Sequence, residues 1–252
     1  MTDTQISVVS YKRPQNTTCD LLMESNIDFW LVYVYLFDPY LDEYIHNYGG
    51  HVRVITEFDK ANLAKKRQLV IDEAKEANYK YCIMMDDDLL SMKNIVLNED
   101  ISIKTLIELL ERYAYKFSEY TVLSPRYNYE DTNIEIYDGK QMNCVSIIDL
   151  KKIDVKYNEN SECEDIELCI NLLEKGHKIG RISTIQVNGK LQDTSGDSGN
   201  SYRYVDRNKN RFIKEGEYLL RRFPEYKDAI IYDETKVKYD YEKLKNCLQI
   251  KN

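Results

Sequence analysis

The sequence has few of the residues that build metal-thiolate and redox sites. Its six cysteines form no CxxC pair, and its three histidines do not stand at metal-ligand spacing from them. Structural zinc and dithiol redox chemistry are therefore unsupported. We expect the cysteines to be reduced and mostly buried in the core.

The chain also lacks a long apolar run and an excess of positive charge. No apolar segment approaches the roughly 20 residues that span a bilayer, and the mean hydropathy is -0.57. The 43 acidic residues outnumber the 35 basic ones, which gives a net charge of -8. The N-terminus has no basic region or small-residue cleavage site, so we interpret it as a strand and not a signal peptide. These features predict a soluble, cytoplasmic protein with no membrane partner.

Short β-branched or aromatic segments instead alternate with amphipathic ones. Strands are predicted at residues 6–10, 29–37, 52–55, 81–85, 120–123, 144–148 and 179–187. Helices are predicted from Asp59 through the following ANLAKKRQLVIDEAKEA, over 103–117 and over 162–175. This order predicts an α/β fold, with a mostly parallel central sheet flanked by helices.

The C-terminal part differs in charge from the rest. A loop rich in Gly, Ser and Asp leads into residues 203–227, which contain eight basic and four acidic residues. An amphipathic helix is predicted through Leu219 and Leu220. We predict a catalytic domain over 1–200 and a basic helical extension over 201–252, packed on the same domain. Its interleaved aromatic and basic residues are typical of a phosphate-contacting surface; a solvated helix face is the alternative.

Three adjacent aspartates, Asp86, Asp87 and Asp88, directly follow the apolar segment 81–85. Open α/β sheets bind ligands outside the carboxyl ends of their strands. Three ionised carboxylates there call for a cation, and Mg²⁺ or Mn²⁺ takes such oxygens while leaving positions free for phosphates. The alternative is a solvated acidic turn or a helix N-cap.

A second acidic pair, Glu164 and Asp165, opens the helix that Gly176 ends. Ser161 and Glu164 have the spacing of a capping box, and acidic residues suit the first turn of any helix. If the pair shares a cleft with the aspartates, one carboxylate could act as general base on an acceptor hydroxyl.

Together these motifs resemble the GT-A glycosyltransferases of the family 2 type. The matching segments are SVVSYKRP, the DDD after a buried strand, and EDIELC with GHKI, which follows the pattern EDxxLCxxLxxxGxKI. The resemblance covers about residues 5 to 190. The SYKRP segment, the helix bearing Arg67 and the DDD are similar to the TET/JBP-associated glycosyltransferases, found largely in phages and inferred to glycosylate hydroxymethylated pyrimidines in DNA.

The resemblance implies a role for each matching residue. Asp88, with Asp86, would bind a divalent metal, Mn²⁺ or Mg²⁺, that bridges the nucleotide diphosphate. Asp165, beside Glu164, would be the base if the reaction inverts the anomeric centre. The donor-binding residues would be Tyr11, Arg13, Asp38, Arg67, Asp86 and Asp87.

The chain departs from the family pattern at two places. A downstream histidine often completes the metal shell, and here Asp193 or Asp197 could take its place. His177 is a weaker candidate, for which we prefer a role at the C-terminus of the helix. Gln68 follows Arg67 where an asparagine is common.

The sequence therefore predicts a metal-dependent glycosyltransferase that moves a sugar from a nucleotide-diphosphate sugar, most simply a UDP-sugar, to an acceptor hydroxyl. A hydroxymethylpyrimidine in phage DNA is the acceptor that the narrower resemblance implies, which would place a phage-encoded enzyme in the host cytoplasm. The alternatives are a saccharide or lipid-linked acceptor, or a non-catalytic module that binds nucleotide-sugar or DNA. A sugar-1-phosphate nucleotidyltransferase is disfavoured because its Gly-rich opening loop is absent.

Overall fold

The computed structural model describes residues 3–126, 134–139, 142–189, 211–234 and 236–250. We call Asp86, Asp87 and Asp88 the acidic turn. The elements up to it are β1 (Thr4–Val9), α1 (Thr17–Glu24), β2 (Leu31–Tyr35), α2 (Leu41–Tyr48), η1 (Gly49–His51), β3 (Val52–Ile55), α3 (Leu63–Glu76) and β4 (Tyr81–Asp86). After it come β5 (Leu89–Asn94), β6 (Glu99–Asp100), α4 (Ile103–Lys116), β7 (Tyr120–Arg126), β8 (Ile136–Asp138), β9 (Val145–Asp149), α5 (Glu164–Glu174) and β10 (Lys178–Gly189). The C-terminal part forms α6 (Arg211–Arg222), η3 (Pro224–Tyr226), β11 (Ile230–Tyr232), β12 (Val237–Tyr239) and α7 (Tyr241–Ile250).

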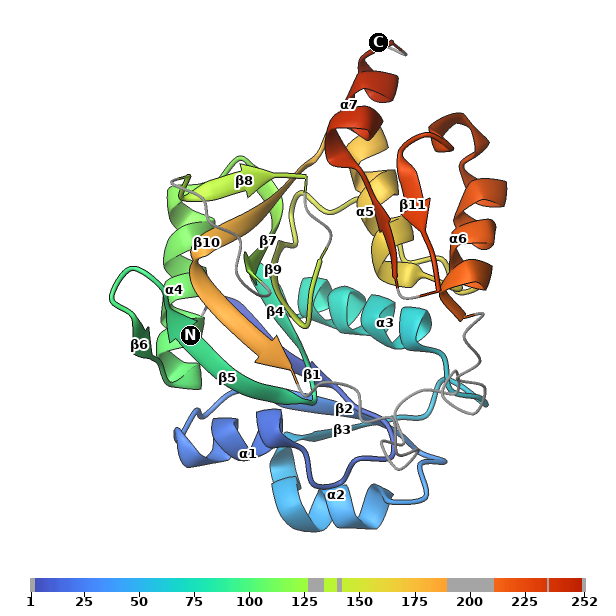
Figure 1. Ribbon diagram of the computed structural model, residues 1–252. Coiled ribbons are helices and arrows are strands. Elements are labelled where there is room, and N and C mark those ends of the chain that lie inside the picture. The colour runs from blue at the N-terminus through green and yellow to red at the C-terminus, as the bar shows by residue number, and fades with distance from the viewer. Residues whose placement is uncertain (1–2, 127–133, 140–141, 190–210, 235, 251–252) are drawn as a thin grey trace.

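The centre of the molecule is a ten-stranded sheet in the order β3-β2-β1-β4-β9-β7-β10-β5-β6, with β8 added beside β10 (Figure 1). Strands β1 to β4, β7 and β10 run in one direction, and β9, β5 and β8 run against them. The predicted α/β fold with a mostly parallel sheet is confirmed, although the half beyond β4 is mixed.

The pairing of β1 with β4 fixes the position of the acidic turn. The two strands are parallel, and Val9 lies opposite Asp86 in the register. The loop after β1 and the turn after β4 therefore leave the same edge of the sheet side by side. At the other side of the turn, the last residue of β10, Gly189, pairs with Leu89.

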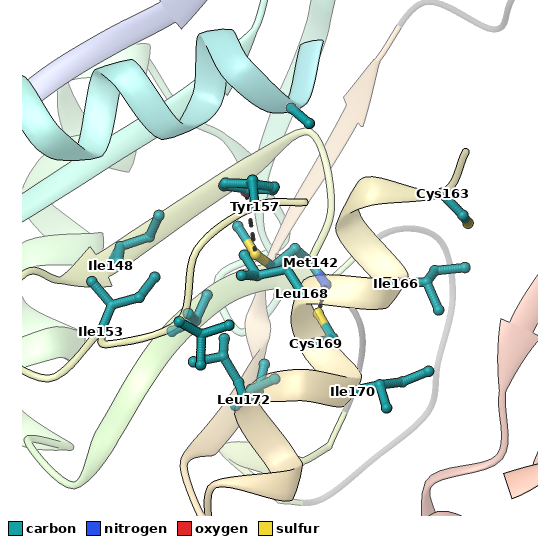
Figure 2. Packing of buried hydrophobic residues seen from close by; sticks show 14 of the residues in the cluster. Met142, Ile148, Ile153, Tyr157, Cys163, Ile166, Leu168, Cys169, Ile170 and Leu172 are labelled. Atoms are coloured by element: carbon teal, nitrogen blue, oxygen red, sulfur yellow. Dashed lines mark hydrogen bonds between the residues drawn. The ribbon is translucent and has the colours of Figure 1, made fainter. Parts of the chain in front are cut away.

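Two apolar cores lie on the two faces of the sheet. One joins α1, α2 and α4 to the sheet, and the other joins α3, α5 and the C-terminal elements to it. Figure 2 shows the second core around α5, where Leu168 and Leu172 point toward Ile148 and Ile153. Leu219, Phe223, Tyr226 and Leu244 of the C-terminal part belong to this same core, whereas the predicted division of the chain at residue 200 falls outside the described residues.

Some predicted boundaries are wrong. Strand β7 continues through Pro125, which lies opposite Ile182 of β10, and β2 is shorter than predicted because Phe29 and Phe37 lie outside it. The helices α1 and α2 were not predicted. Their buried residues include Thr18, Tyr44 and Tyr48, which a search for aliphatic helical spacing passes over.

All six cysteines are free, as expected. Among the described residues, no helix is both long enough and apolar enough to cross a bilayer.

Candidate active site

The middle aspartate of the acidic turn is buried and fully engaged. Asp87 is 2% exposed. Its carboxylate accepts hydrogen bonds from Ser10 Oγ at 2.6 Å and from Arg13 Nη1 at 2.9 Å. Thr18 of α1 adds a second anchor, because its hydroxyl donates to the Asp86 carbonyl at 2.7 Å and accepts from the Leu89 amide. Asp87 therefore ties the turn to the loop after β1.

The two flanking aspartates are open by comparison. The side chain of Asp86 is 36% exposed and that of Asp88 is 22% exposed. Burial and then the neighbouring Asp88, Asp87 and Glu164 carboxylates raise the pKa of Asp86 to about 7, against the opposing effect of Arg67. Burial and Asp87 also raise the pKa of Asp88, although Arg13 Nη1 lies 3.4 Å from its carboxylate. Two neighbouring carboxylates whose pKa values are both raised mark a candidate functional site.

Arg67 connects this turn to the helix α5. It is buried on α3, and its Nη2 donates to Asp86 Oδ1 at 3.0 Å. Its Nη1 contacts Asp165 and lies 3.8 Å from Glu164 Oε1. Although burial opposes the charged form, the adjacent carboxylates, led by Asp86, raise the pKa of Arg67. The structure thus brings both predicted acidic motifs to one guanidinium, which lies between them.

The predicted capping box at the start of α5 is wrong. The N-cap residue is Cys163, which makes no side-chain capping bond. Ser161 lies two residues earlier and accepts from the Cys163 amide at 3.1 Å. Glu164 is a member of the first turn and lies near Arg67 instead of folding back to an N-cap amide. The other end is as predicted, since Gly176 has φ of 79° and follows the helix in a Schellman arrangement.

The loop after β1 carries two of the predicted donor-binding residues and is fixed by a third. Asp38 is buried and accepts from the Lys12 amide at 2.8 Å and the Tyr40 amide at 3.0 Å. The Tyr11 ring lies edge-on to Tyr35, with centroids 5.6 Å apart. Asp38 is therefore engaged with the backbone of the loop that presents Tyr11 and Arg13.

Sequence reasoning missed Lys66. This lysine is 1% exposed, and its Nζ donates to the Ser10 carbonyl and, at 3.1 Å, to the Tyr33 carbonyl. The Nζ also lies 3.9 Å from the centroid of the Tyr35 ring. Burial lowers the pKa of Lys66 to about 7, and Asp87 and Asp38 oppose this effect. On a helix rich in lysine, nothing in the sequence distinguished Lys66 from its exposed neighbours.

His177 is not brought to the cluster around Arg67. His177 precedes β10, at the opposite end of that strand from Gly189, and bonds Thr121 Oγ1 at 3.0 Å and Asp154 Oδ1 at 2.8 Å. Asp193 and Asp197 lie outside the described residues.

Asp86 and Asp88 fit a divalent ion. Gly189 lies against Asp88, and a Cβ at that position would stand 3.1 Å from the carboxylate oxygen, so the glycine keeps the side chain accessible. Within the described ranges, no group of three or more His, Cys, Asp or Glu residues surrounds a metal position. One or two carboxylates, completed by water and substrate phosphates, are the usual ligand set of Mg²⁺.

The fold is shared with nucleotide-sugar enzymes. Glucosyl-3-phosphoglycerate synthase from Mycobacterium tuberculosis in complex with UDP is similar with a TM-score of 0.53 at 8% identity, over 78% of this chain and 74% of that chain. Its complex with Mn²⁺, UDP and phosphoglyceric acid gives a TM-score of 0.52 at 8% identity, over 75% and 71% of the two chains. Such low identity shows the fold alone, which is the predicted GT-A fold.

Sequence comparison is more specific about the family. No curated protein sequence matches the chain. The profile of the family described as "TET-Associated Glycosyltransferase" matches residues 4–196, which include β1, the acidic turn, Arg67 and α5. The chain therefore belongs to the TET-associated glycosyltransferase family.

Proposed function

We propose that the protein is a divalent-metal-dependent transferase that moves a sugar from a UDP-sugar to the hydroxyl of a 5-hydroxymethylpyrimidine in DNA. The observation that carries the proposal is the cluster at the carboxyl edge of the sheet, where Arg67 contacts both Asp86 and Asp165. Family membership supports the transfer of a sugar. The structural neighbour bound to Mn²⁺ and UDP supports the donor class and the metal.

The residues of the acidic turn would hold the donor. Asp86 and Asp88 would bind the metal ion, which neutralises charge on the departing nucleoside diphosphate when it is present. Arg13 and Arg67 add two guanidinium groups beside these carboxylates. They would pair with phosphate oxygens in a geometry to which guanidinium is well suited. Tyr11 would lie beside the nucleobase.

Asp165 would receive the proton of the acceptor hydroxyl in an inverting transfer. The acceptor oxygen forms a bond to the anomeric carbon while the bond from that carbon to the diphosphate breaks. The hydroxyl proton passes to the Asp165 carboxylate. Arg67 Nη1 contacts this carboxylate and would orient it, and Glu164 Oε1 lies 3.8 Å from the same guanidinium nitrogen.

The DNA acceptor is supported by the family and by the sequence of the extension. In the described part of the extension, the exposed basic residues Lys214, Arg221 and Lys227 alternate with the exposed acidic residues Glu217 and Glu225. This surface has little net charge. The stronger basic cluster is Arg203, Arg207 and Lys209, which lies outside the described residues.

Two linked measurements test the proposal. Thermal unfolding is followed with UDP-glucose, UDP-galactose, UDP-GlcNAc and UDP-GalNAc, with and without Mn²⁺, because a ligand that binds only the folded state raises the melting temperature. The stabilising donor is then incubated with DNA containing 5-hydroxymethylcytosine or 5-hydroxymethyluracil, and the nucleosides are analysed by mass spectrometry. We expect the mass of one sugar residue, a hexose or an N-acetylhexosamine according to the donor, on the modified base and none on unmodified DNA.

Each negative result has a separate meaning. A donor that binds and is consumed only with saccharide or lipid-linked acceptors would overturn the DNA acceptor. Donor binding without turnover on any acceptor would indicate a binding module. No shift with any donor would overturn the donor site.

A further inference from the structure

One buried carboxylate in the first turn of α5 has no part in the proposed chemistry. Glu167 is 1% exposed. It accepts hydrogen bonds from Tyr218 Oη at 2.6 Å, Asn158 Nδ2 at 2.9 Å and Arg222 Nε at 3.1 Å. Burial alone would raise its pKa, but hydrogen bonds from Ser161, Tyr218, Asn158 and Arg222 hold the pKa of Glu167 below its ordinary value. A buried charge of this kind is stabilised by its partners, two of which belong to α6.

The extension forms hydrogen bonds with both ends of α5. Tyr218 and Arg222 are four residues apart, so they project from one face of α6 and reach the same carboxylate. At the last turn of α5, Tyr226 Oη donates to Glu174 Oε1 at 2.7 Å. Figure 1 shows α6 and β11 on the side of α5 that faces away from the sheet.

Apolar packing joins the same two parts. Figure 2 shows that Ile166 and Ile170 point away from Leu168 and Leu172. Both isoleucines are nevertheless buried, and they share a core with Leu219 and Phe223 of the extension. The helix is therefore enclosed between the sheet and the extension.

The same turn of α5 bears the two carboxylates that face Arg67. Asp165 and Glu167 are two positions apart, about 200° around the helix, so they face opposite sides. The N-cap residue Cys163 makes no side-chain capping hydrogen bond to this turn. Arg67 contacts this turn at Asp165. Tyr218 and Arg222 bind it at Glu167, on the opposite side of the helix.

We infer that the C-terminal extension is a positioning element of the active site, acting through Tyr218 and Arg222 on Glu167. It fixes the rotation of α5 and thereby the place of Asp165 beside Arg67. The family match ends at residue 196, before α6 begins, so Tyr218 and Arg222 lie outside the matched region while Glu167 lies within it. The inference deepens the proposed function and rests on it for the role of Asp165.

The test compares Tyr218→Phe, Arg222→Leu and the double variant with wild type in the full-length chain. Tyr218→Phe removes one oxygen and keeps the ring, so it is the variant that preserves packing. Glu217→Gln is the matched control, because Glu217 is an exposed residue on the same helix. Arg222→Lys tests rescue by a retained charge. Far-ultraviolet circular dichroism and thermal melting check that each variant is folded.

Two readouts are measured on every variant. Hydrogen exchange of the amides at 164–167 is expected to accelerate about 10-fold in the double variant, because local opening is no longer resisted from the α6 side. A displacement near 1 Å at a reacting group can cost as much as ~10²-fold in rate. We expect kcat to fall about 10-fold, while the affinity for UDP with Mn²⁺ stays within about twofold. Glu217→Gln should change neither readout, and Arg222→Lys should recover part of both.

The outcomes separate this inference from the proposed function. Unchanged exchange at 164–167 in both Tyr218→Phe and the double variant would overturn the restraint. Faster exchange with unchanged kcat would overturn positioning. If wild type itself shows no turnover, the proposed function fails and the positioning of a catalytic base fails with it, while the exchange data still decide whether the extension restrains α5.

Discussion

The inner and outer parts of the acidic turn use the same residue type for different purposes. Asp87 faces inward and is satisfied by Ser10 and Arg13. Asp86 and Asp88 are more exposed and have raised pKa values. The comparison shows that adjacent aspartates differ according to how many hydrogen-bond donors the fold supplies to each, which makes Asp87 an anchor and leaves its two neighbours more open.

The largest effect that we expect from this contrast is a loss of activity when Asp88 is substituted. Asp88→Asn should lower Mn²⁺-dependent kcat on the order of 10³-fold, because a bound cation contributes several kcal/mol of charge stabilisation in the transition state. The melting temperature should change little, since Asp88 has one 3.4 Å contact to Arg13. Steady-state kinetics and thermal melting check this, with the exposed Asp100→Asn as control. Activity within tenfold of wild type would remove Asp88 from the metal site.

The inner part should respond in the opposite way, with the main effect on stability. Asp87→Ala leaves the Ser10 hydroxyl and the Arg13 guanidinium without their shared acceptor. Breaking a buried, hydrogen-bonded pair of this kind costs about 2–4 kcal/mol of unfolding free energy. Urea unfolding measures the loss, and Asp87→Asn should lose less because its amide oxygen still accepts. A loss no larger than that of Asp100→Asn would contradict the anchoring role.

A third way to sharpen the contrast is to vary pH. The pKa of Asp86 in the fold is about 7, above its ordinary value of 3.8. Between those values the folded protein holds a proton that the unfolded chain does not, so this group favours the metal-free fold at low pH and loses that contribution as pH rises through 7. A metal ion must displace the proton, so its binding has the reverse dependence.

Mn²⁺ binding in the presence of UDP should therefore weaken as pH falls from 8 to 6, by up to about tenfold per pH unit below 7. Calorimetry at three pH values measures the affinity, and buffers of different ionisation enthalpy measure the protons released. The same affinity at pH 6 and 8, without proton release, would show that Asp86 is not a ligand.

The position of the three aspartates at the carboxyl end of a strand could be predicted from sequence, because it depends on a local pattern. An apolar strand followed by three aspartates identifies the carboxyl edge of β4, and the helical spacing of α4 predicted Ile103–Lys116 closely. The contrast between Asp87 and Asp88 could not be predicted. It depends on Ser10 and Arg13, which lie more than 70 residues away in the chain.

The same limit explains the other omissions. Lys66 is adjacent to Lys65 in a charged stretch. It is buried because its Nζ binds the Ser10 carbonyl in the loop after β1 and the Tyr33 carbonyl. Strand β5 has a polar, partly exposed pattern and gains its order by pairing with β10. Glu167 resembles any acidic residue of a first helical turn until α6 packs against it. Long-range pairing decides each of these cases.

The smallest expected effect concerns the one described histidine that sequence offered as a metal ligand. His177 is engaged with Thr121 and the exposed Asp154, at the far end of β10 from Gly189. His177→Asn should leave Mn²⁺ affinity and kcat unchanged within about twofold, because exposed ion pairs contribute little and the site lies away from the acidic turn. Calorimetry with Mn²⁺ and UDP checks this. A loss comparable to that of Asp88→Asn would mean that the opposite edge of the sheet takes part in metal binding, and the contrast drawn within the turn would then be incomplete.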